Sequence, residues 1–288
     1  MKKWYLLSRP QLNAPHLCQM ATETPTEFTI KEFDISSIFP RDIDDPEQTG
    51  SKIVCLGKPG SGKSVLLLDI AYRKKHQFPA ALIVNGNEDS NETFKKHFPE
   101  TMIHTELTDE LIENLRQRQN IAKKHLENPW LLFIKDDCID TANHFKKPSV
   151  VTFYKRARHW DVVSVLGLQY MFEIPLVVRV CIDYAFIFRE TNLNSRKIIY
   201  ENFASIIPTF KLFCKIMDEI TGDYTALVID NRTQTNNPED CVFWYRAQEI
   251  PKDFKFCCED AWMFNEQRLY KSSNSEAADD KSVSSNES

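Results

Sequence analysis

Glycine is scarce in this chain, which has only 7 glycines among 288 residues. That is about a third of the ~7% found in average proteins. Three of the seven, Gly57, Gly60 and Gly62, fall within six residues. This concentration indicates a segment whose backbone must adopt conformations that other residues avoid.

Long apolar runs and paired cysteine motifs are also missing. No run approaches the ~20 apolar residues of a membrane-spanning helix, and Trp4–Leu7 is too short for the core of a secretory signal, so we expect no transmembrane segment. The 8 cysteines include no C-x-x-C pair, and several lie in apolar runs, which favours reduced thiols in a cytosol-like compartment. The adjacent Cys257 and Cys258 have no nearby histidine, which argues against zinc. We expect this pair and the aromatic run Phe243–Tyr245 to pack in the core.

A charge excess of one sign is absent from the body of the chain. The formal net charge of −5 belongs to the ends, because residues 51–270 contain 29 basic and 29 acidic side chains. This balance excludes a broad basic coat for nucleic acid but permits a local basic lining.

The composition changes along the chain and predicts four segments. Residues 1–26 are expected to be a flexible N-terminus, and residues 27–250 a single folded domain that begins with a packed lead-in at 27–50. Residues 251–270 form a C-terminal extension. Residues 271–288 are rich in serine and acids and are expected to be a disordered tail, because they cannot bury enough apolar surface to offset their ordering entropy.

Within the domain, short apolar runs alternate with helical patterns. We expect buried strands at 52–56, 81–84, 130–134, 162–168, 184–188 and 224–229, and an edge strand at 241–245. We expect helices at 62–76, 108–128, 194–207 and 208–221. This alternation predicts an α/β fold with a mainly parallel sheet flanked by helices.

The glycine cluster satisfies G-x-x-x-x-G-K-[ST], the phosphate-binding loop (P-loop), between an expected strand and an expected helix. Successive backbone N–H groups of such a loop surround phosphate oxygens, and the helix N-terminus adds positive potential. Lys63 is expected to reach the β- and γ-phosphates, and the Ser64 hydroxyl to bind Mg²⁺. The alternative is a glycine-rich turn that merely begins a helix. The residues expected to bind ATP are Gly57, Lys58, Pro59, Gly60, Ser61, Gly62, Lys63, Ser64 and Val65.

Polar side chains follow two of the expected strands. Asp136 is expected to hold Mg²⁺, and Asp137 to orient and deprotonate the attacking water, although both acids could simply cap a helix. Lys135 interrupts the apolar run before them, and either points outwards or lowers the pKa of the acids. Gln169 ends the next strand and is expected either to sense the γ-phosphate and the water or to be a polar cap.

The densest basic stretch is Lys155–His159. It is either a solvated face, a contact to DNA phosphates, or the source of an arginine that acts on the nucleotide of a neighbouring subunit. Arg158 is the first choice for that arginine, and Arg179 and Arg189 are weaker alternatives.

This ordered set resembles the virion-packaging ATPases of large nucleocytoplasmic DNA viruses, the poxvirus-type branch of the FtsK–HerA superfamily. The resemblance covers roughly residues 50–247, and Lys135 departs from the apolar residue usual in that family. The matching residues are GKPGSGKS at 57–64, LLFIKDDC at 131–138, Arg158-His159, Gln169 before Ile174-Pro175, Arg179, and Val228-Ile229-Asp230.

The resemblance implies a RecA-like P-loop core with an additional strand, and a ring of identical subunits in which ATP and Mg²⁺ drive double-stranded DNA into a preformed capsid. It also implies capsid or packaging-vertex partners, and a location in viral factories of the host cytoplasm and in the virion.

Two other classes remain open on the sequence alone. A P-loop kinase or small-molecule phosphotransferase would share the phosphate cradle but should add an arginine-rich lid, and no obvious one is present. A structural protein could bind nucleotide without turning it over. A GTPase would need an N-K-x-D loop, which the sequence lacks.

Overall fold

The described part of the chain is built on one open sheet. The computed structural model describes residues 2–6, 26–45, 47–139, 141–169 and 174–270. The sheet order is β1-β2-β10-β9-β8-β3-β7-β6-β4-β5. Its strands are β1 (Lys2–Leu6), β2 (Thr26–Glu32), β3 (Lys52–Leu56), β4 (Ala80–Asn85), β5 (Ile103–His104), β6 (Leu131–Asp136), β7 (Val162–Leu168), β8 (Tyr184–Ile187), β9 (Thr225–Asp230) and β10 (Val242–Arg246).

Most neighbouring strands of this sheet run in the same direction. Strand β9 is antiparallel to β8 and β10, and β1 is antiparallel to β2, whereas the other paired strands are parallel. Strand β7 lies between β3, which leads into the P-loop, and β6, which ends in Asp136. The predicted α/β fold with an additional strand in the P-loop core is therefore confirmed.

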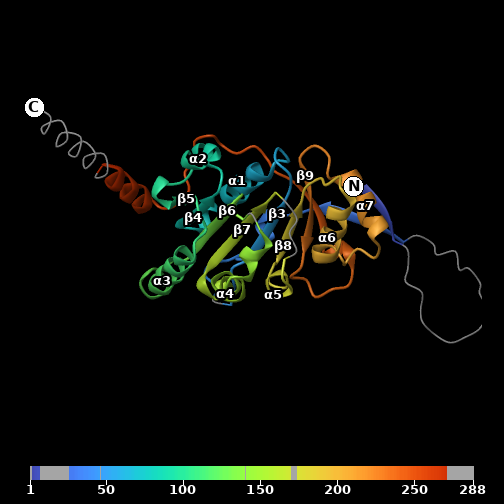
Figure 1. The fold of residues 1–288 in the computed structure, drawn as a ribbon, viewed down its shortest axis with the longest axis horizontal. Coiled ribbons are helices and arrows are strands. Elements are labelled where there is room, and N and C mark those ends of the chain that lie inside the picture. The colour runs from blue at the N-terminus through green and yellow to red at the C-terminus, as the bar shows by residue number, and fades with distance from the viewer. Residues whose placement is uncertain (1, 7–25, 46, 140, 170–173, 271–288) are drawn as a thin grey trace, which may run out of the picture.

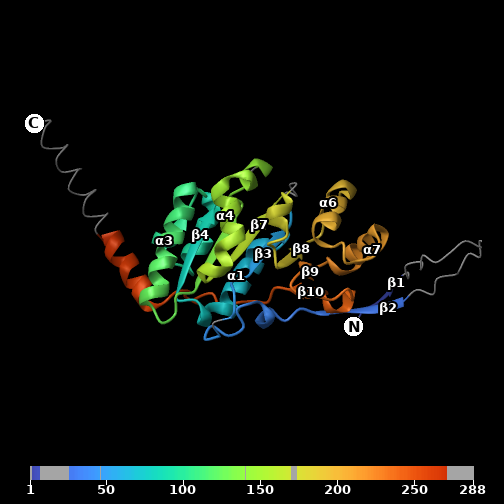
Figure 2. The same cartoon turned by 90° about the horizontal axis from the view of Figure 1, so that it is seen from below.

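Helices cover both faces of the sheet (Figures 1 and 2). Because side chains alternate along a strand, each strand contributes to two separate cores. Helices α1 (Lys63–Lys74) and α2 (Glu88–Lys95) belong to one face. The other face carries α3 (Asp109–His125), α4 (Pro148–Arg156), α5 (Leu176–Arg179), α6 (Leu193–Phe203) and α7 (Phe210–Ile220).

Several elements differ from the expectation, and β2, β5, α4 and α5 are among those that were not expected. The expected edge strand at 241–245 is instead internal, because β10 pairs with both β9 and β2. Residues 2–6 form a strand against β2 where a flexible segment was expected, because the two segments pair in register from Lys2↔Ile30 to Leu6↔Thr26. Helix α2 was not expected, since its segment shows no clear apolar period. Residues 7–25 and 271–288, expected to be flexible, lie outside the described residues.

The segments flanking the core are held to it by specific contacts. Ile35 and Ile38 of the lead-in are buried, and Lys74 of α1 donates hydrogen bonds to the Ile38 and Pro40 carbonyls at 2.6 and 2.9 Å. Residues 259–270 form a helix beyond the sheet (Figure 1). None of the helices within the described residues is long and apolar enough to cross a bilayer.

The cysteines and late aromatics pack less uniformly than expected. Cys257 is partly buried but Cys258 is exposed, so the expected burial of the pair is wrong for Cys258, which lies where the chain leaves the core. Tyr245 is buried, whereas Phe243 and Trp244 are only partly buried. The seven cysteines among the described residues are free thiols.

Candidate active site

The candidate site lies at the carboxyl ends of strands β3, β6 and β7. Leu56 pairs with Leu168, and Asp136 pairs with Gly167, so the P-loop, the acids and Gln169 begin at one edge of the sheet. In open parallel sheets this edge is where ligands bind. A cavity of about 620 Å³ opens there. Its lining residues are Lys58, Pro59, Gly60, Gly62, Lys63, Ser64, Val65, Asn87, Asp137, Gln169, Tyr224, Arg246 and Ala247.

The P-loop backbone needs its glycines. Gly60 and Gly62 have φ values of +75° and +96°, a region that residues with a Cβ rarely adopt. Gly62 also caps α1, so the first turn of the helix points its N–H groups at the cavity. Gly57 and Ser61 are not part of the lining: the Gly57 N–H donates to the Leu168 carbonyl at 3.0 Å, and the Ser61 Oγ is buried.

Lys63 is the cation at the centre of the site. Its side chain is only 5% exposed, and its Nζ lies 2.9 Å from Asp137 Oδ1 and 3.6 Å from Asp136 Oδ1. A buried ammonium needs such partners, because its desolvation otherwise exceeds what a single neighbour returns. The pairing holds the lysine at the floor of the cavity.

Ser64 and Asp136 form a pair of oxygen ligands suited to a small divalent cation. Ser64 Oγ donates to Asp136 Oδ2 at 3.0 Å, and Asp136 is 1% exposed. Burial raises the pKa of Asp136, and the charge of Lys63 acts in the opposite direction. Asp136 Oδ1 is buried without a hydrogen-bond partner. A carboxylate oxygen left in this state beside a hydroxyl fits Mg²⁺, which prefers oxygen ligands.

Gly167 makes room for the Asp136 carboxylate. A Cβ built on Gly167 would lie 2.3 Å from Asp136 Oδ1, closer than any real contact. Gly167 was not singled out from the sequence, although a glycine inside an apolar strand signals a close approach by another group.

Asp137 and Gln169 form the second half of the acidic site. Gln169 Nε2 donates to Asp137 Oδ2, while Asp137 Oδ1 accepts from Lys63. Asp137 has a φ of +48°, which turns the chain out of β6, and its side chain is 18% exposed. The two acids therefore differ: Asp136 is buried against Ser64, and Asp137 is accessible from the cavity.

Lys135 satisfies neither of the two expectations for it. It is 2% exposed, on the face of the sheet opposite to Asp136, where its Nζ lies 4.5 and 4.8 Å from the ring centres of Phe153 and Tyr154. Burial lowers the pKa of Lys135 to about 7. It does not point outwards, and the pKa of Asp136 is raised rather than lowered.

Comparison with known proteins identifies the family. A family model described as Poxvirus A32 protein matches residues 44–245. The chain belongs to this family. The family that the sequence motifs resemble is therefore confirmed.

The relatives of this A32-family chain are viral. It is 42% identical over 240 residues to uncharacterized protein 088R of invertebrate iridescent virus 3, covering 81% of this chain and 92% of the relative. It is 40% identical over 245 residues to uncharacterized protein 075L of invertebrate iridescent virus 6, covering 84% and 95%. A solved structure of the genome packaging NTPase B204 from Sulfolobus turreted icosahedral virus 2 with ATP-gammaS is 17% identical, with a TM-score of 0.49, and covers 69% of this chain and 98% of that one.

The three arginines weighed from the sequence do not line the cavity. Arg158 precedes β7, and its carbonyl accepts from the Gly50 N–H at 3.3 Å, so it lies at the amino edge of the sheet. It therefore cannot act on the nucleotide bound by its own chain. Arg179 donates to Asn202 at 2.7 Å. Arg189 follows β8 at the carboxyl edge and bonds the Asp218 carbonyl at 3.1 Å.

Four residues that line the cavity were not singled out from the sequence: Asn87, Tyr224, Arg246 and Ala247. Arg246 directly follows the expected strand 241–245, but that strand was placed at an edge, away from the site. Tyr224 was read as the start of a buried strand, whereas it is 65% exposed. The positions of Tyr224 and Arg246 depend on β9 being antiparallel to β8 and β10, which no local sequence pattern reveals.

Proposed function

We propose that this chain is an ATP-hydrolysing DNA translocase that packages a viral double-stranded DNA genome into a capsid. One observation carries the hydrolytic part: the P-loop lysine, a buried carboxylate with an unbonded oxygen, and a second carboxylate held by Gln169 share one cavity edge. Membership of the A32 family and its packaging resemblance carry the DNA part.

The P-loop binds the triphosphate. Backbone N–H groups around Gly60 and Gly62 and the first turn of α1 supply donors and positive potential. Lys63 exchanges its contact with Asp137 for the β- and γ-phosphates, which keeps its charge compensated throughout.

Ser64 and Asp136 would hold Mg²⁺, which when bound neutralises charge on the phosphates. The raised pKa of Asp136 has a consequence for this role: the carboxylate must be ionised to serve, and a cation beside it favours that form.

Asp137 accepts the proton of the attacking water. It is the more exposed acid, and one of its oxygens is freed when Lys63 moves to the phosphates. Gln169 holds the other oxygen, so the carboxylate keeps its orientation during the proton transfer. A positioned base of this kind contributes roughly 10²–10⁴ in rate.

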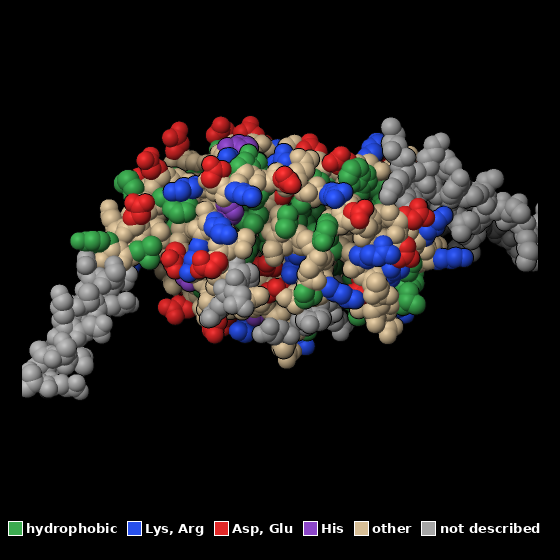
Figure 3. All heavy atoms as spheres, turned by 90° about the horizontal axis from the view of Figure 1, so that it is seen from above, with side chains coloured by type: hydrophobic (Ala, Val, Ile, Leu, Met, Phe, Trp, Pro, Cys, Tyr) green, Lys and Arg blue, Asp and Glu red, His purple; other side chains and the backbone are tan. Residues whose placement is uncertain are grey.

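The proposal also includes contact with double-stranded DNA and assembly of identical subunits into a ring. On the face drawn in Figure 3, lysines and arginines are interspersed with acids. That face carries no single-sign coat (Figure 3), and residues 51–270 are balanced in charge, so a local segment such as Lys155–His159 is the better candidate for the DNA contact. We extend the proposal to capsid or packaging-vertex partners and to viral factories of the host cytoplasm and the virion, as the resemblance implies.

The test is ATP turnover by the purified full-length chain with and without double-stranded DNA. Turnover that depends on Lys63 and rises with DNA supports the translocase. Turnover that ignores DNA but responds to a phosphate acceptor indicates a phosphotransferase instead. Nucleotide binding without turnover under all conditions indicates a structural nucleotide site.

A further inference from the structure

A tyrosine lies over the P-loop in an unusual backbone conformation. The turn before β9 holds Asp223 and Tyr224 at φ values of +49° and +58°, a region that a bulky residue seldom adopts. Tyr224 is nevertheless 65% exposed, and a Cβ on Gly62 would lie 3.3 Å from its Cδ1. The chain thus places an aromatic face against the P-loop at some conformational cost, although burial gains little there.

The position of the tyrosine relative to the acids gives the direction of a bound nucleotide. Asp137 and Gln169 follow β6 and β7, on one side of β3. Tyr224 directly precedes β9 and Arg246 ends β10, both on the other side of β3, and the two residues line the same cavity. A triphosphate whose terminal phosphate meets Asp137 must therefore direct its nucleoside towards Tyr224.

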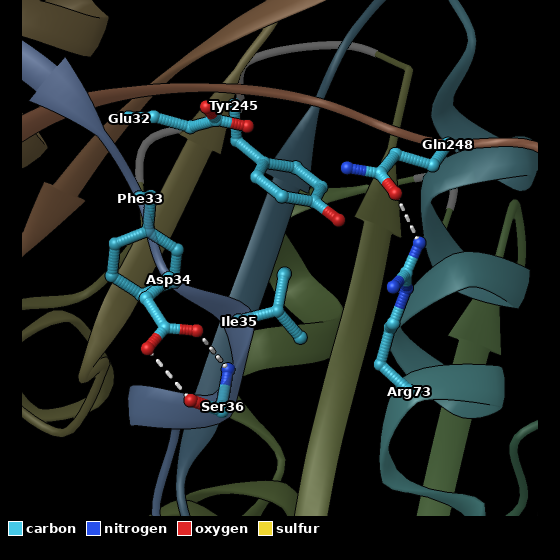
Figure 4. A pocket seen from close by; sticks show the side chains of 8 residues that line it. All are labelled: Glu32, Phe33, Asp34, Ile35, Ser36, Arg73, Tyr245 and Gln248. Carbon is cyan, nitrogen blue, oxygen red and sulfur yellow. Dashed lines mark hydrogen bonds between the residues drawn. The ribbon is translucent and has the colours of Figure 1, made fainter.

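The lining beside Tyr224 is firmly anchored, on the strand that pairs Arg246 with Thr225. Tyr245 donates to the buried carboxylate of Asp69 on α1, and Arg73 Nη2 donates to Gln248 Oε1 at 2.5 Å. Figure 4 shows Tyr245 extending from the end of β10 towards α1, and Arg73 reaching Gln248. The two residues between these anchors, Arg246 and Ala247, are therefore held in place against α1.

The surface of this part of the cavity is apolar and open. Val65, in the first turn of α1, is 55% exposed and lines the cavity together with Ala247. An exposed valine, an exposed tyrosine and an arginine line one phosphate-binding cavity, and each can contact the flat face of an aromatic ligand.

We infer that Tyr224 is the stacking platform for the purine base of the nucleotide, with Arg246 and Val65 as the neighbouring lining of the base site. The inference rests on the proposed function, in which the P-loop holds the triphosphate. Among the described residues, the lining on this side of β3 carries no side-chain carboxylate or amide to read the edge of a base. Stacking tolerates different bases, so this site holds ATP and GTP with similar affinity.

The experiment compares two probes on the full chain by calorimetry: ATPγS, which has a base, and inorganic tripolyphosphate, which has none. Stacking on an aromatic ring contributes about 5- to 150-fold in affinity. Tyr224→Ala should therefore weaken ATPγS binding by about 5-fold or more and leave tripolyphosphate binding unchanged. Tyr224→Phe should keep both affinities. Tyr270→Ala, at another exposed tyrosine, is the matched control.

The outcomes separate this inference from the proposed function. If tripolyphosphate binds equally well to wild type and to Lys63→Ala, the phosphate cradle itself is wrong. If it binds through Lys63 and Tyr224→Ala leaves ATPγS affinity unchanged, only the base site is wrong. A preference of wild type for ATPγS over GTPγS above about 30-fold would overturn recognition by stacking, because it requires a group that reads the base edge.

Discussion

Strand β3 connects two buried lysines with opposite surroundings. Lys63, beyond its carboxyl end, is 5% exposed and has two carboxylate partners within 4 Å. Lys52, its first residue, is 1% exposed, and its Nζ has no hydrogen-bond partner. Burial lowers the pKa of Lys52 to about 8, against an opposing effect of Asp183 and with a further lowering by Arg158.

The difference separates a charge that is useful from one that is merely tolerated. The carboxyl edge compensates Lys63 with acids that can release it to a phosphate. The amino edge gives the Lys52 ammonium no hydrogen-bond partner and only the partial compensation of Asp183, so its charge is a cost to the folded state. Perturbed charges therefore mark the site only where they converge on a cavity.

The largest expected difference between the two lysines is in ATP turnover after each one is removed. Lys63→Ala should abolish ATP binding and turnover, because the helix N-terminus alone then holds the phosphates. Lys52→Met should leave turnover within about twofold, since Lys52 lies at the opposite edge. Steady-state ATPase assays on both variants, with circular dichroism to verify folding, check this. Wild-type turnover by Lys63→Ala would refute the P-loop assignment.

The second test asks whether the amino edge of one subunit contacts the nucleotide site at the carboxyl edge of its neighbour. Arg158 lies at the amino edge, so in a ring it could complete only a neighbour's site; arginines in this role contribute about 10³–10⁵ in rate. Arg158→Ala and Asp137→Asn should each be inactive alone. Mixed, they should recover part of the turnover, because some interfaces pair an intact acid with an intact arginine.

Co-assembly of the mixed subunits must be verified by affinity capture of a tagged partner. Absence of recovery in verified mixtures would exclude Arg158 from the neighbour's site. Mixing Arg189→Ala subunits with Asp137→Asn subunits is the matched comparison. Arg189 lies at the carboxyl edge, and its side chain is 47% exposed.

The third test distinguishes the roles of the two acids at the carboxyl edge, Asp136 and Asp137. Asp137→Asn should lower turnover by roughly 10²–10⁴ while keeping Mg–ATP bound, because an amide keeps the shape but is no base. Asp136→Asn should instead weaken binding that depends on Mg²⁺, since it removes a charged ligand. Calorimetry with ATPγS, with and without Mg²⁺, distinguishes the two. Identical behaviour of the variants in both assays contradicts the division of roles.

The carboxyl edge was predictable because its chemistry is local in sequence. The P-loop, Asp136–Asp137 and Gln169 each follow an apolar run, and parallel strands bring such ends together. Tyr224 and Arg246 were missed for the converse reason: their place depends on β9 running antiparallel and on β10 pairing with β2. Those pairings are settled by long-range packing, which no short pattern encodes.

Lys135 and Lys52 illustrate the same limit for single side chains. A lysine in an apolar run predicts a charge that turns outwards, yet both are buried. The face of a strand follows from its register, and a residue at odd or even position is then buried whatever its charge. The burial of Lys135 depends on the aromatic rings of α4, which pack there only in the folded chain.

The smallest expected effect is on stability, and it tests the amino edge. The pKa of Lys52 is about 8 in the folded protein and 10.5 when unfolded. Below pH 8 both states hold the proton, so the folded state bears the full cost, about 3 kcal/mol at pH 7. Between pH 8 and 10.5 the unfolded state binds more protons, and stability rises with pH.

Lys52→Met has no such titration and a side chain of similar length. It should therefore raise the free energy of unfolding at pH 7 by about 1–3 kcal/mol, and the gain should fall to roughly half at pH 9.5. Urea unfolding of wild type and variant at both pH values measures this difference. Titrating groups far from Lys52 cancel in it, whereas Lys135, whose pKa is lowered by burial and further by the charge of Lys52, adds a contribution of its own. A gain that is the same at both pH values would mean that Lys52 stays protonated in the folded protein up to pH 9.5, so that its pKa is not lowered and the methionine acts by packing alone. A loss of stability at pH 7 would mean that Asp183 compensates the buried lysine, and the contrast between the two ends of β3 would then disappear.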